Sequence, residues 1–140
     1  MTRVYLAGAI TGQTLEQARS WRDAWGPLIR SLRMEVYSPT RGKSDIKGEL
    51  TSKFDEGRGA FKRDLWDIDR ADIVLVNFEA AKHVSIGTVA EMGYAFAAGK
   101  FILVVAPRGE HPHDHLFIEE MASHVVPTMQ DAYDWLRHMA

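Results

Sequence analysis

The stretch at residues 85–95 reads Ser85-Ile86-Gly87-Thr88-Val89-Ala90-Glu91-Met92-Gly93-Tyr94-Ala95 and passes from a hydroxyl residue and a glycine into a helical pattern. Two apolar runs flank this stretch, one at residues 72–78 and the other at residues 101–106. Short apolar runs bounded by turn residues are typical of buried strands. A strand, a loop, a helix and a second strand in this order form a βαβ unit, so this part of the chain predicts two parallel strands joined by a helix.

Glu91 is the most informative polar residue of this unit. Thr88 is the predicted N-cap of the helix, and Glu91 three residues later completes a capping-box pattern. This reading places Glu91 in the first turn of the helix, near the carboxyl end of the preceding strand, where open α/β sheets bind ligands. The spacing alone leaves two interpretations open, a capping carboxylate or a functional one.

Strands and helices alternate along the whole chain. Further strand patterns cover residues 4–7, 34–37 and 125–126, and further helical patterns cover residues 14–29, 60–70, 116–122 and 128–139. This alternation predicts a single domain over residues 1–140, an α/β fold with a five-stranded parallel sheet and helices on both faces. The expected form is a flavodoxin-like or Rossmann-like three-layer sandwich with a topological switch point beside the first strand.

Local signals predict how the first and last helices begin. Thr14 opens a capping-box pattern before the first helix, and Thr128 opens a similar pattern before the last one. The pair Gly26-Pro27 lies inside the first helical pattern. Because an interior proline removes a helical hydrogen bond, we expect this pair to break or kink the first helix.

The length, charge and composition of the chain exclude several classes of protein. The chain has 140 residues and a formal charge of -2, from 17 Lys and Arg against 19 Asp and Glu, which argues against a general nucleic-acid binder. No cysteine is present, so disulfides and thiolate chemistry are excluded. No apolar run approaches the roughly 20 residues of a membrane span, and the N-terminus leads into a strand pattern without a signal peptide. The sequence therefore predicts a cytoplasmic protein without a membrane partner.

Two loops are candidates for contact with a ligand. The turn after the first strand contains Gly8, Ala9 and Thr11, and a glycine-bearing turn at this place often approaches a phosphate. The turn has neither the dinucleotide-binding nor the Walker A pattern, so an ordinary strand-to-helix connection is an equal alternative. Residues 41–59 are polar with little periodicity, and we interpret them as a loop that is either a substrate-side lid or a surface excursion.

A histidine cluster follows the fourth strand, with His111, His113 and His115 at alternate positions. Three imidazoles this close could bind a metal, but the alternation with an intervening proline matches no standard zinc spacing. The sequence therefore favours solvated histidines, with Asp114 as the N-cap of the next helix. We expect no metal and no cofactor.

Three parts of the chain, taken together, resemble one enzyme family. They are the first strand with Tyr5, the helix with Asp64 before the third strand, and the segment 85–95 with Glu91. The chain is similar in these parts to the nucleoside 2-deoxyribosyltransferases and to the related deoxynucleoside 5'-monophosphate N-hydrolases. The resemblance implies that Glu91 is the nucleophile, that Tyr5 orients it, and that Asp64 serves the leaving base as an acid.

The resemblance also implies a substrate-binding set, which comprises Gly8, Ala9, Thr11, Ser85, Gly87 and Thr88. The transferases usually have an aspartate six residues before the nucleophile, whereas this chain has Ser85 there, as the monophosphate hydrolases do. Those hydrolases carry a serine and an arginine in the first loop, where this chain has Ala9 and Thr11. Ser85 therefore favours a nucleotide, and the first loop favours a free nucleoside. Other arginines that could contact a phosphate are Arg19, Arg22, Arg58 and Arg108.

The activity that the resemblance implies is cleavage of the N-glycosidic bond of a (deoxy)nucleoside, with transfer of the deoxyribosyl group to another base in nucleotide salvage. Hydrolysis of 5'-monophosphates is the alternative within the family. A non-catalytic nucleotide-sensing domain and a structural assembly subunit are the alternatives outside it. A sensor needs no nucleophile, so Tyr5, Asp64 and Glu91 together favour an enzyme. The expected partners are a small-molecule substrate and, by resemblance, further copies of the chain in a homodimer or larger homo-oligomer.

Overall fold

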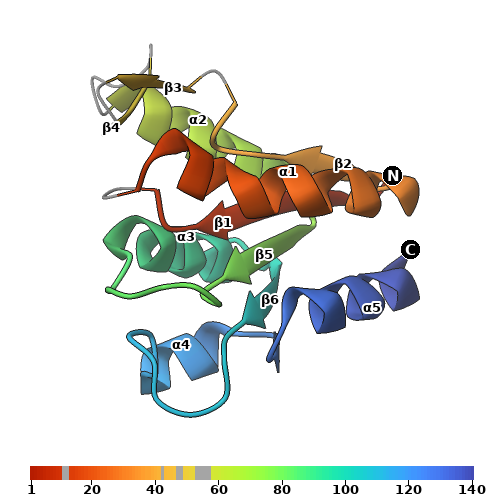
Figure 1. Ribbon diagram of the computed structural model, residues 1–140. Coiled ribbons are helices and arrows are strands. Elements are labelled where there is room, and N and C mark those ends of the chain that lie inside the picture. The colour runs from red at the N-terminus through yellow and green to blue at the C-terminus, as the bar shows by residue number, and fades with distance from the viewer. Residues whose placement is uncertain (11–12, 42, 47–48, 53–57) are drawn as a thin grey trace.

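A five-stranded parallel sheet forms the centre of the protein (Figure 1). The computed structural model describes residues 1–10, 13–41, 43–46, 49–52 and 58–140, with only the backbone described for residues 43–46, 49–52 and 58. The strands of the sheet are β1 Arg3–Gly8, β2 Glu35–Tyr37, β5 Ile73–Asn77, β6 Phe101–Val105 and β7 His124–Val126. They lie side by side in the order β2-β1-β5-β6-β7.

The strand order reverses at β1. The chain passes from β1 to β2 at one edge of the sheet and then returns to β5 on the other side of β1, so that Tyr5 pairs with both Tyr37 and Val74. Every neighbouring pair in this sheet is parallel. The order is that of a flavodoxin-like fold, which confirms the fold class predicted from the sequence. Ligands of such folds bind outside the carboxyl ends of the strands at the reversal, here beside β1.

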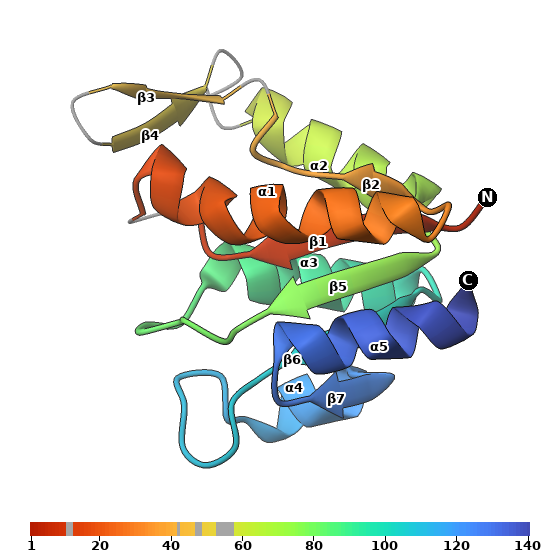
Figure 2. The ribbon, with the colours of Figure 1, turned by 45° about the vertical axis from the view of Figure 1, so that its right-hand side comes forward.

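Helices cover both faces of the sheet (Figures 1 and 2). One face carries α1 (Leu15–Ser31) and α5 (Met129–Met139), and the other carries α2 (Arg58–Arg70), α3 (Ile86–Ala97) and α4 (Leu116–Met121). Both faces of the strands are therefore buried, and for this reason the strands read as continuous apolar runs rather than as alternating ones.

Two hydrophobic cores hold the three layers together. On the side of α1 and α5, Leu6 packs in one cluster with Ile29. On the other side, Tyr5 packs in a second cluster with Met92 of α3. Successive strand residues point to opposite faces, and this alternation sends Tyr5 toward the helical layer that carries Glu91.

Residues 43–52 include a β-hairpin where the sequence predicted a loop. Strand β3 (Lys43–Ile46) pairs antiparallel with β4 (Glu49–Ser52), and the hairpin lies beside the N-terminal ends of α1 and α2 (Figure 2). The prediction of a continuous loop over 41–59 is wrong here, because a polar hairpin forms its backbone hydrogen bonds without the apolar alternation that reveals strands. Residues 42, 47–48 and 53–57 of this segment lie outside the described residues.

The first and last helices begin where the sequence predicts. The hydroxyls of Thr14 and Thr128 each accept a hydrogen bond from the amide three residues later, at 3.1 Å in both cases. Helix α1 nevertheless continues through Pro27, so the predicted break is wrong. The capping box and the burial of Ile29 against the sheet offset the cost of an interior proline, about 3 kcal/mol. No helix within the described ranges is long and apolar enough to cross a lipid bilayer.

Candidate active site

Helix α3 begins before the position that the sequence predicts. Ser85 is the N-cap, and Thr88 is buried in the first turn with its hydroxyl 2.8 Å from the Ser85 hydroxyl. The first helical hydrogen bond runs from the Val89 amide to the Ser85 carbonyl, at 3.0 Å. The predicted capping box of Thr88 and Glu91 is therefore wrong, and Glu91 lies in the second turn. A carboxylate in the second turn does not cap a helix, which favours the functional interpretation of Glu91.

A cavity of about 310 Å³ lies between the carboxyl end of β1 and the start of α3. Its volume is at the lower end of the range for small-molecule sites. The cavity is lined by Gly8, Ile10, Asp64, Val84, Ser85, Ile86, Gly87, Thr88 and Glu91. The fold thus brings Asp64 of α2 and Glu91 of α3 to one cavity, together with four of the residues predicted to bind substrate, Gly8, Ser85, Gly87 and Thr88.

Tyr5 lies in the core beside Glu91 and is fully buried. Burial, followed by the negative charges of Glu91 and Asp64, raises the pKa of Tyr5 well above its ordinary value. The hydroxyl therefore stays protonated at neutral pH and can donate a hydrogen bond to the Glu91 carboxylate, a contact that also raises the pKa of Tyr5. This contact is looser than an ideal hydrogen bond, since the hydroxyl has no partner of standard geometry among the described residues.

Arg22 of α1 is buried behind the site. Its guanidinium donates hydrogen bonds to the backbone carbonyls of Leu6 at 3.3 Å, of Gly8 at 3.2 Å, and of Ala18. Burial lowers the pKa of Arg22 to about 10, while the acidic groups of the site act in the opposite direction, so the side chain is cationic at neutral pH. Arg22 is buried against these backbone carbonyls and lines neither the cavity of Glu91 nor the one that adjoins it, which argues against the phosphate contact that the sequence left open.

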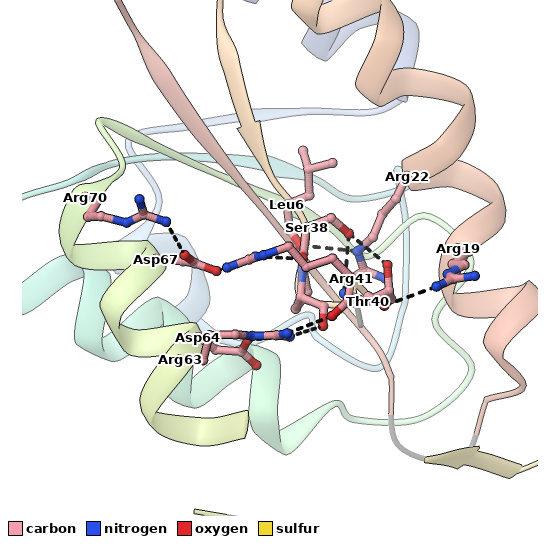
Figure 3. A network of polar contacts seen from close by, with 11 residues as sticks. Leu6, Arg19, Arg22, Ser38, Thr40, Arg41, Arg63, Asp64, Asp67 and Arg70 are labelled. Carbon is pink, nitrogen blue, oxygen red and sulfur yellow. Dashed lines mark hydrogen bonds and ion pairs between the residues drawn. The ribbon is translucent and has the colours of Figure 1, made fainter. Parts of the chain in front are cut away.

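A polar network on α2 holds Asp64 in place (Figure 3). The guanidinium of Arg63 pairs with Asp64 at 3.5 Å and also donates hydrogen bonds to the carbonyls of Pro39 and Arg41. The side chains of Arg63 and Asp64 are both mostly buried. These contacts tie the start of α2 to the segment that follows β2, and they fix the position of Asp64 at the cavity.

Asp67, almost one turn further along α2, is completely buried and joins the same network (Figure 3). Its carboxylate pairs with Arg70 at 2.7 Å and with Arg41. The guanidinium of Arg70 also lies 4.2 Å from the centre of the Tyr37 ring at the end of β2. This second set of ion pairs locks α2 against the edge of the sheet.

A second cavity, of about 530 Å³, adjoins the first at Val84 and Ser85. It is lined by Ala9, Gln13, Gln17, Ser20, Ala80, Lys82, His83, Val84 and Ser85. Ala9 therefore lines this cavity rather than the one with Glu91, and Thr11 lies outside the described residues. Lys82 and His83 were not identified from the sequence, because two exposed basic residues in a loop form no pattern. Lys82 brings a positive charge to this cavity, which shares Ser85 with the cavity of Glu91.

His113 is buried, so the prediction of solvated histidines is wrong for this residue. Its ring stacks on Phe78 with the centroids 3.8 Å apart, and its Nε2 accepts a hydrogen bond from the Ser85 amide at 2.8 Å. The N-cap of α4 is His115 rather than Asp114, because the His115 imidazole accepts a hydrogen bond from a first-turn amide at 3.0 Å. The stacking partner and the backbone donor accommodate one face and Nε2 of the ring, whereas Nδ1 is buried without a hydrogen-bond partner among the described residues.

The remaining residues that the sequence singled out include Arg108 and His111, which line a separate cavity of about 430 Å³ near the ends of β6 and β7. Its lining includes Arg108, His111 and His113, so Arg108 belongs to a different cavity from Glu91. Over the part of the chain that the structure describes, no three His, Asp or Glu side chains lie close enough together to hold a metal ion. The side chain of Arg58 is outside the described residues.

Solved structures share this fold over almost the whole chain. A conserved protein from Enterococcus faecalis V583 has a TM-score of 0.74 at 14% identity, covering 100% of this chain and 99% of its own. A 2-deoxyribosyltransferase from the psychrotolerant bacterium Bacillus psychrosaccharolyticus has a TM-score of 0.71 at 24% identity, covering 95% and 91%. The CMP N-glycosidase of Clostridium botulinum has a TM-score of 0.61 at 20% identity, covering 96% and 98%. At these identities the similarity shows the fold alone.

Sequence comparison gives the family. No curated protein sequence matches the chain significantly. The family model described as "Nucleoside 2-deoxyribosyltransferase like" matches residues 1–109, a region that contains Tyr5, Asp64 and Glu91. Because this match covers well over half of the 140 residues and confirms the resemblance found in the motifs, the chain belongs to the nucleoside 2-deoxyribosyltransferase-like family.

Proposed function

We propose that this protein cleaves the N-glycosidic bond of a deoxynucleoside and transfers the deoxyribosyl group to another base. One observation carries the proposal, namely that Glu91 and Asp64 line the same cavity of about 310 Å³ at the reversal of the sheet. The buried hydroxyl of Tyr5 beside Glu91 supports it, as does membership of the family. The fold shared with a 2-deoxyribosyltransferase is consistent with the same activity.

In the proposed reaction the Glu91 carboxylate attacks C1' of the sugar while the bond from C1' to the base breaks. The electron pair of that bond leaves with the base, and a glycosyl ester forms on Glu91. The transition state resembles an oxocarbenium ion, whose positive charge the carboxylate stabilises. A ring nitrogen of the acceptor base then attacks C1', displaces Glu91 and loses its proton.

The neighbouring residues have separate parts in this reaction. Tyr5 donates its hydroxyl hydrogen toward Glu91 and thereby restricts the rotamer of the nucleophile. Asp64 is the proposed partner of the leaving base, to which it gives a proton or a hydrogen bond. A carboxyl group gives a proton or donates a hydrogen bond only in its protonated form, so Asp64 has to hold a proton at this step.

Hydrolysis of deoxynucleoside 5'-monophosphates is the second candidate function, and one observation favours it. Lys82 and His83 line the cavity that adjoins the catalytic one at Ser85, and Lys82 supplies a cation that the first loop lacks. A phosphate on the 5' side of the sugar would then lie beside Ser85, and water would replace the acceptor base. Hydrolysis and transfer share the Glu91 intermediate and differ in what resolves it.

Product analysis separates these reactions. The purified protein is incubated with deoxynucleosides and with their 5'-monophosphates, each with and without a free acceptor base, and the products are resolved by chromatography. The transferase predicts a new nucleoside only when the acceptor is present. The hydrolase predicts free base and sugar phosphate from the monophosphate without any acceptor. Binding without any product in all four mixtures would contradict both and favour a sensor.

A further inference from the structure

A buried imidazole contacts the residue at which helix α3 begins. The Ser85 amide donates a hydrogen bond of 2.8 Å to Nε2 of His113, across 28 positions of sequence. The ring of His113 is 3% exposed and stacks on Phe78, with an angle of 11° between the planes. Phe78 follows β5 directly and is itself buried, so the imidazole bridges the end of β5 and the start of α3.

The direction of this hydrogen bond determines the protonation state of the ring. Nε2 accepts a proton from an amide, so its lone pair is free and the proton of the neutral ring is on Nδ1. A protonated ring carries hydrogens on both nitrogens, and the Nε2 hydrogen would then face the hydrogen of the Ser85 amide. The contact therefore exists only with neutral His113.

Several charged groups surround this ring. His111 accepts a hydrogen bond from the His113 amide at 3.2 Å. Other ionisable groups that line the cavity next to His113 are Arg108, Asp114 and Glu119. Across Ser85, the adjoining cavity carries Lys82 and His83, and the catalytic cavity carries Asp64 and Glu91.

Burial, with a smaller contribution from His111, lowers the pKa of His113 below the ordinary value. The folded protein therefore binds this proton less readily than the unfolded chain does. Stability falls as the pH drops below the unfolded value of about 6.5 toward the lower folded pKa.

We propose that His113, as the neutral tautomer with its proton on Nδ1, is a positioning residue that fixes Ser85 and the start of α3 at the substrate cavity. The expected effect on turnover rests on the proposed function, whereas the hydrogen bond between Ser85 and His113 is independent of it. Ser85 lines both the catalytic cavity and the adjoining one, so a shift of its backbone moves the predicted binding group for sugar or phosphate. Glu91 lies further along the helix, in its second turn. Loss of the contact to His113 should therefore weaken substrate binding more than it slows the step at Glu91.

The contact is tested first without any measurement of activity. Two-bond nitrogen–proton correlation NMR of the wild type at pH 7.5 should show the Nδ1–H tautomer for His113, with a pKa below about 6.5. Exchange of the Ser85 amide should be about fivefold to tenfold faster in His113→Leu, the range expected for one lost hydrogen bond. His113→Gln should restore protection, because its amide oxygen can take the place of Nε2. A proton on Nε2 at pH 7.5, or unchanged Ser85 exchange in His113→Leu, would overturn the proposal.

Turnover is the second readout. With the deoxynucleoside substrate, His113→Leu should raise KM about tenfold and change kcat much less, and His113→Gln should recover most of this loss. In the wild type, kcat/KM should fall with His113 protonation at acidic pH, and His113→Gln should lose that limb. Equal losses in the Leu and Gln variants would show a merely structural role. The exposed His138→Gln serves as the control and should match the wild type. If no preparation turns over any substrate, the proposed function fails while the NMR measurements still decide the role of His113.

Discussion

At the scale of single residues, the carboxylate of Glu91 has the central part in the proposed chemistry. It lines the cavity with Asp64, and its position in the second turn of α3 gives it no capping role. We expect Glu91→Gln to lower kcat/KM at least about a thousandfold, or ~4 kcal/mol in transition-state stabilisation, with the fold retained. Steady-state kinetics and circular dichroism would measure both. Near-normal turnover in Glu91→Gln, with the exposed Glu120→Gln as control, would exclude the covalent mechanism.

For Tyr5 we predict a different effect, because its hydroxyl lies beside Glu91, the proposed nucleophile, and Tyr5 does not line the cavity. Tyr5→Phe keeps the buried ring and removes the donor to Glu91, so kcat should fall about tenfold to a hundredfold while KM changes little. Stability should change little, because the hydroxyl has no ideally placed partner among the described residues. A variant that alters KM alone would disprove the orienting role. Tyr133→Phe, on α5, is the matched control.

At the scale of elements, we expect the start of α3 to determine which substrate the site accepts. Ser85 lies where helical amides favour an anion and where two cavities meet. Ser85→Asp puts a negative charge within ~4 Å of a bound phosphate, which costs roughly 1 to 4 kcal/mol depending on the local dielectric. We expect a large loss of kcat/KM for a 5'-monophosphate and little or no loss for a free nucleoside.

The wild type supplies the reference for this comparison. Because the first loop lacks an arginine, we expect the wild type to prefer the free deoxynucleoside. A wild type that prefers the monophosphate at least tenfold, with the preference reversed in Ser85→Asp, would establish the hydrolase. Ser31→Asp, at the exposed end of α1, should leave both substrates unaffected.

Helix α2 offers a prediction about stability. Asp67 is completely buried and pairs with Arg70 and Arg41, so Asp67→Asn leaves two guanidinium groups without their carboxylate (Figure 3). We expect the free energy of unfolding to fall by about 3 kcal/mol, the lower end for breaking a buried ion pair, because both arginines keep partial access to solvent. Urea denaturation measures this loss. The exposed pair of Asp134 and Arg137 gives the control, in which Asp134→Asn should cost under ~1 kcal/mol.

At the scale of the whole molecule, the parallel sheet brings residues of separate helices to one site. The reaction proposed for this site uses no metal ion. In that proposal, carboxylates and a tyrosine hydroxyl are the nucleophile, the acid and the orienting group. Dialysis against EDTA should therefore leave kcat and KM unchanged in the same assay. Loss of activity that a divalent ion such as Zn²⁺ restores would contradict this mechanism.

The parallel sheet and the three residues proposed for catalysis could be predicted from the amino-acid sequence. Buried parallel strands need continuous apolar runs, and these runs are visible without a structure. Tyr5, Asp64 and Glu91 were singled out because the three segments that contain them resemble one enzyme family. Local patterns were a poor guide at Pro27, where packing and capping offset a helix-breaking residue, and in the polar hairpin of β3 and β4.

The surroundings of those residues became visible in the folded protein and could not be predicted from the sequence. The sequence left Arg22 open as a phosphate contact, but its guanidinium donates hydrogen bonds to backbone carbonyls of β1. The sequence also predicted a solvated His113, whereas its ring stacks on Phe78 and accepts a hydrogen bond from the Ser85 amide. Lys82 and His83 line the cavity beside Ser85, a position that no sequence pattern indicated. The physical reason is the same in each case. Hydrogen bonding and burial of a polar side chain depend on partners distant in sequence, which no local pattern encodes.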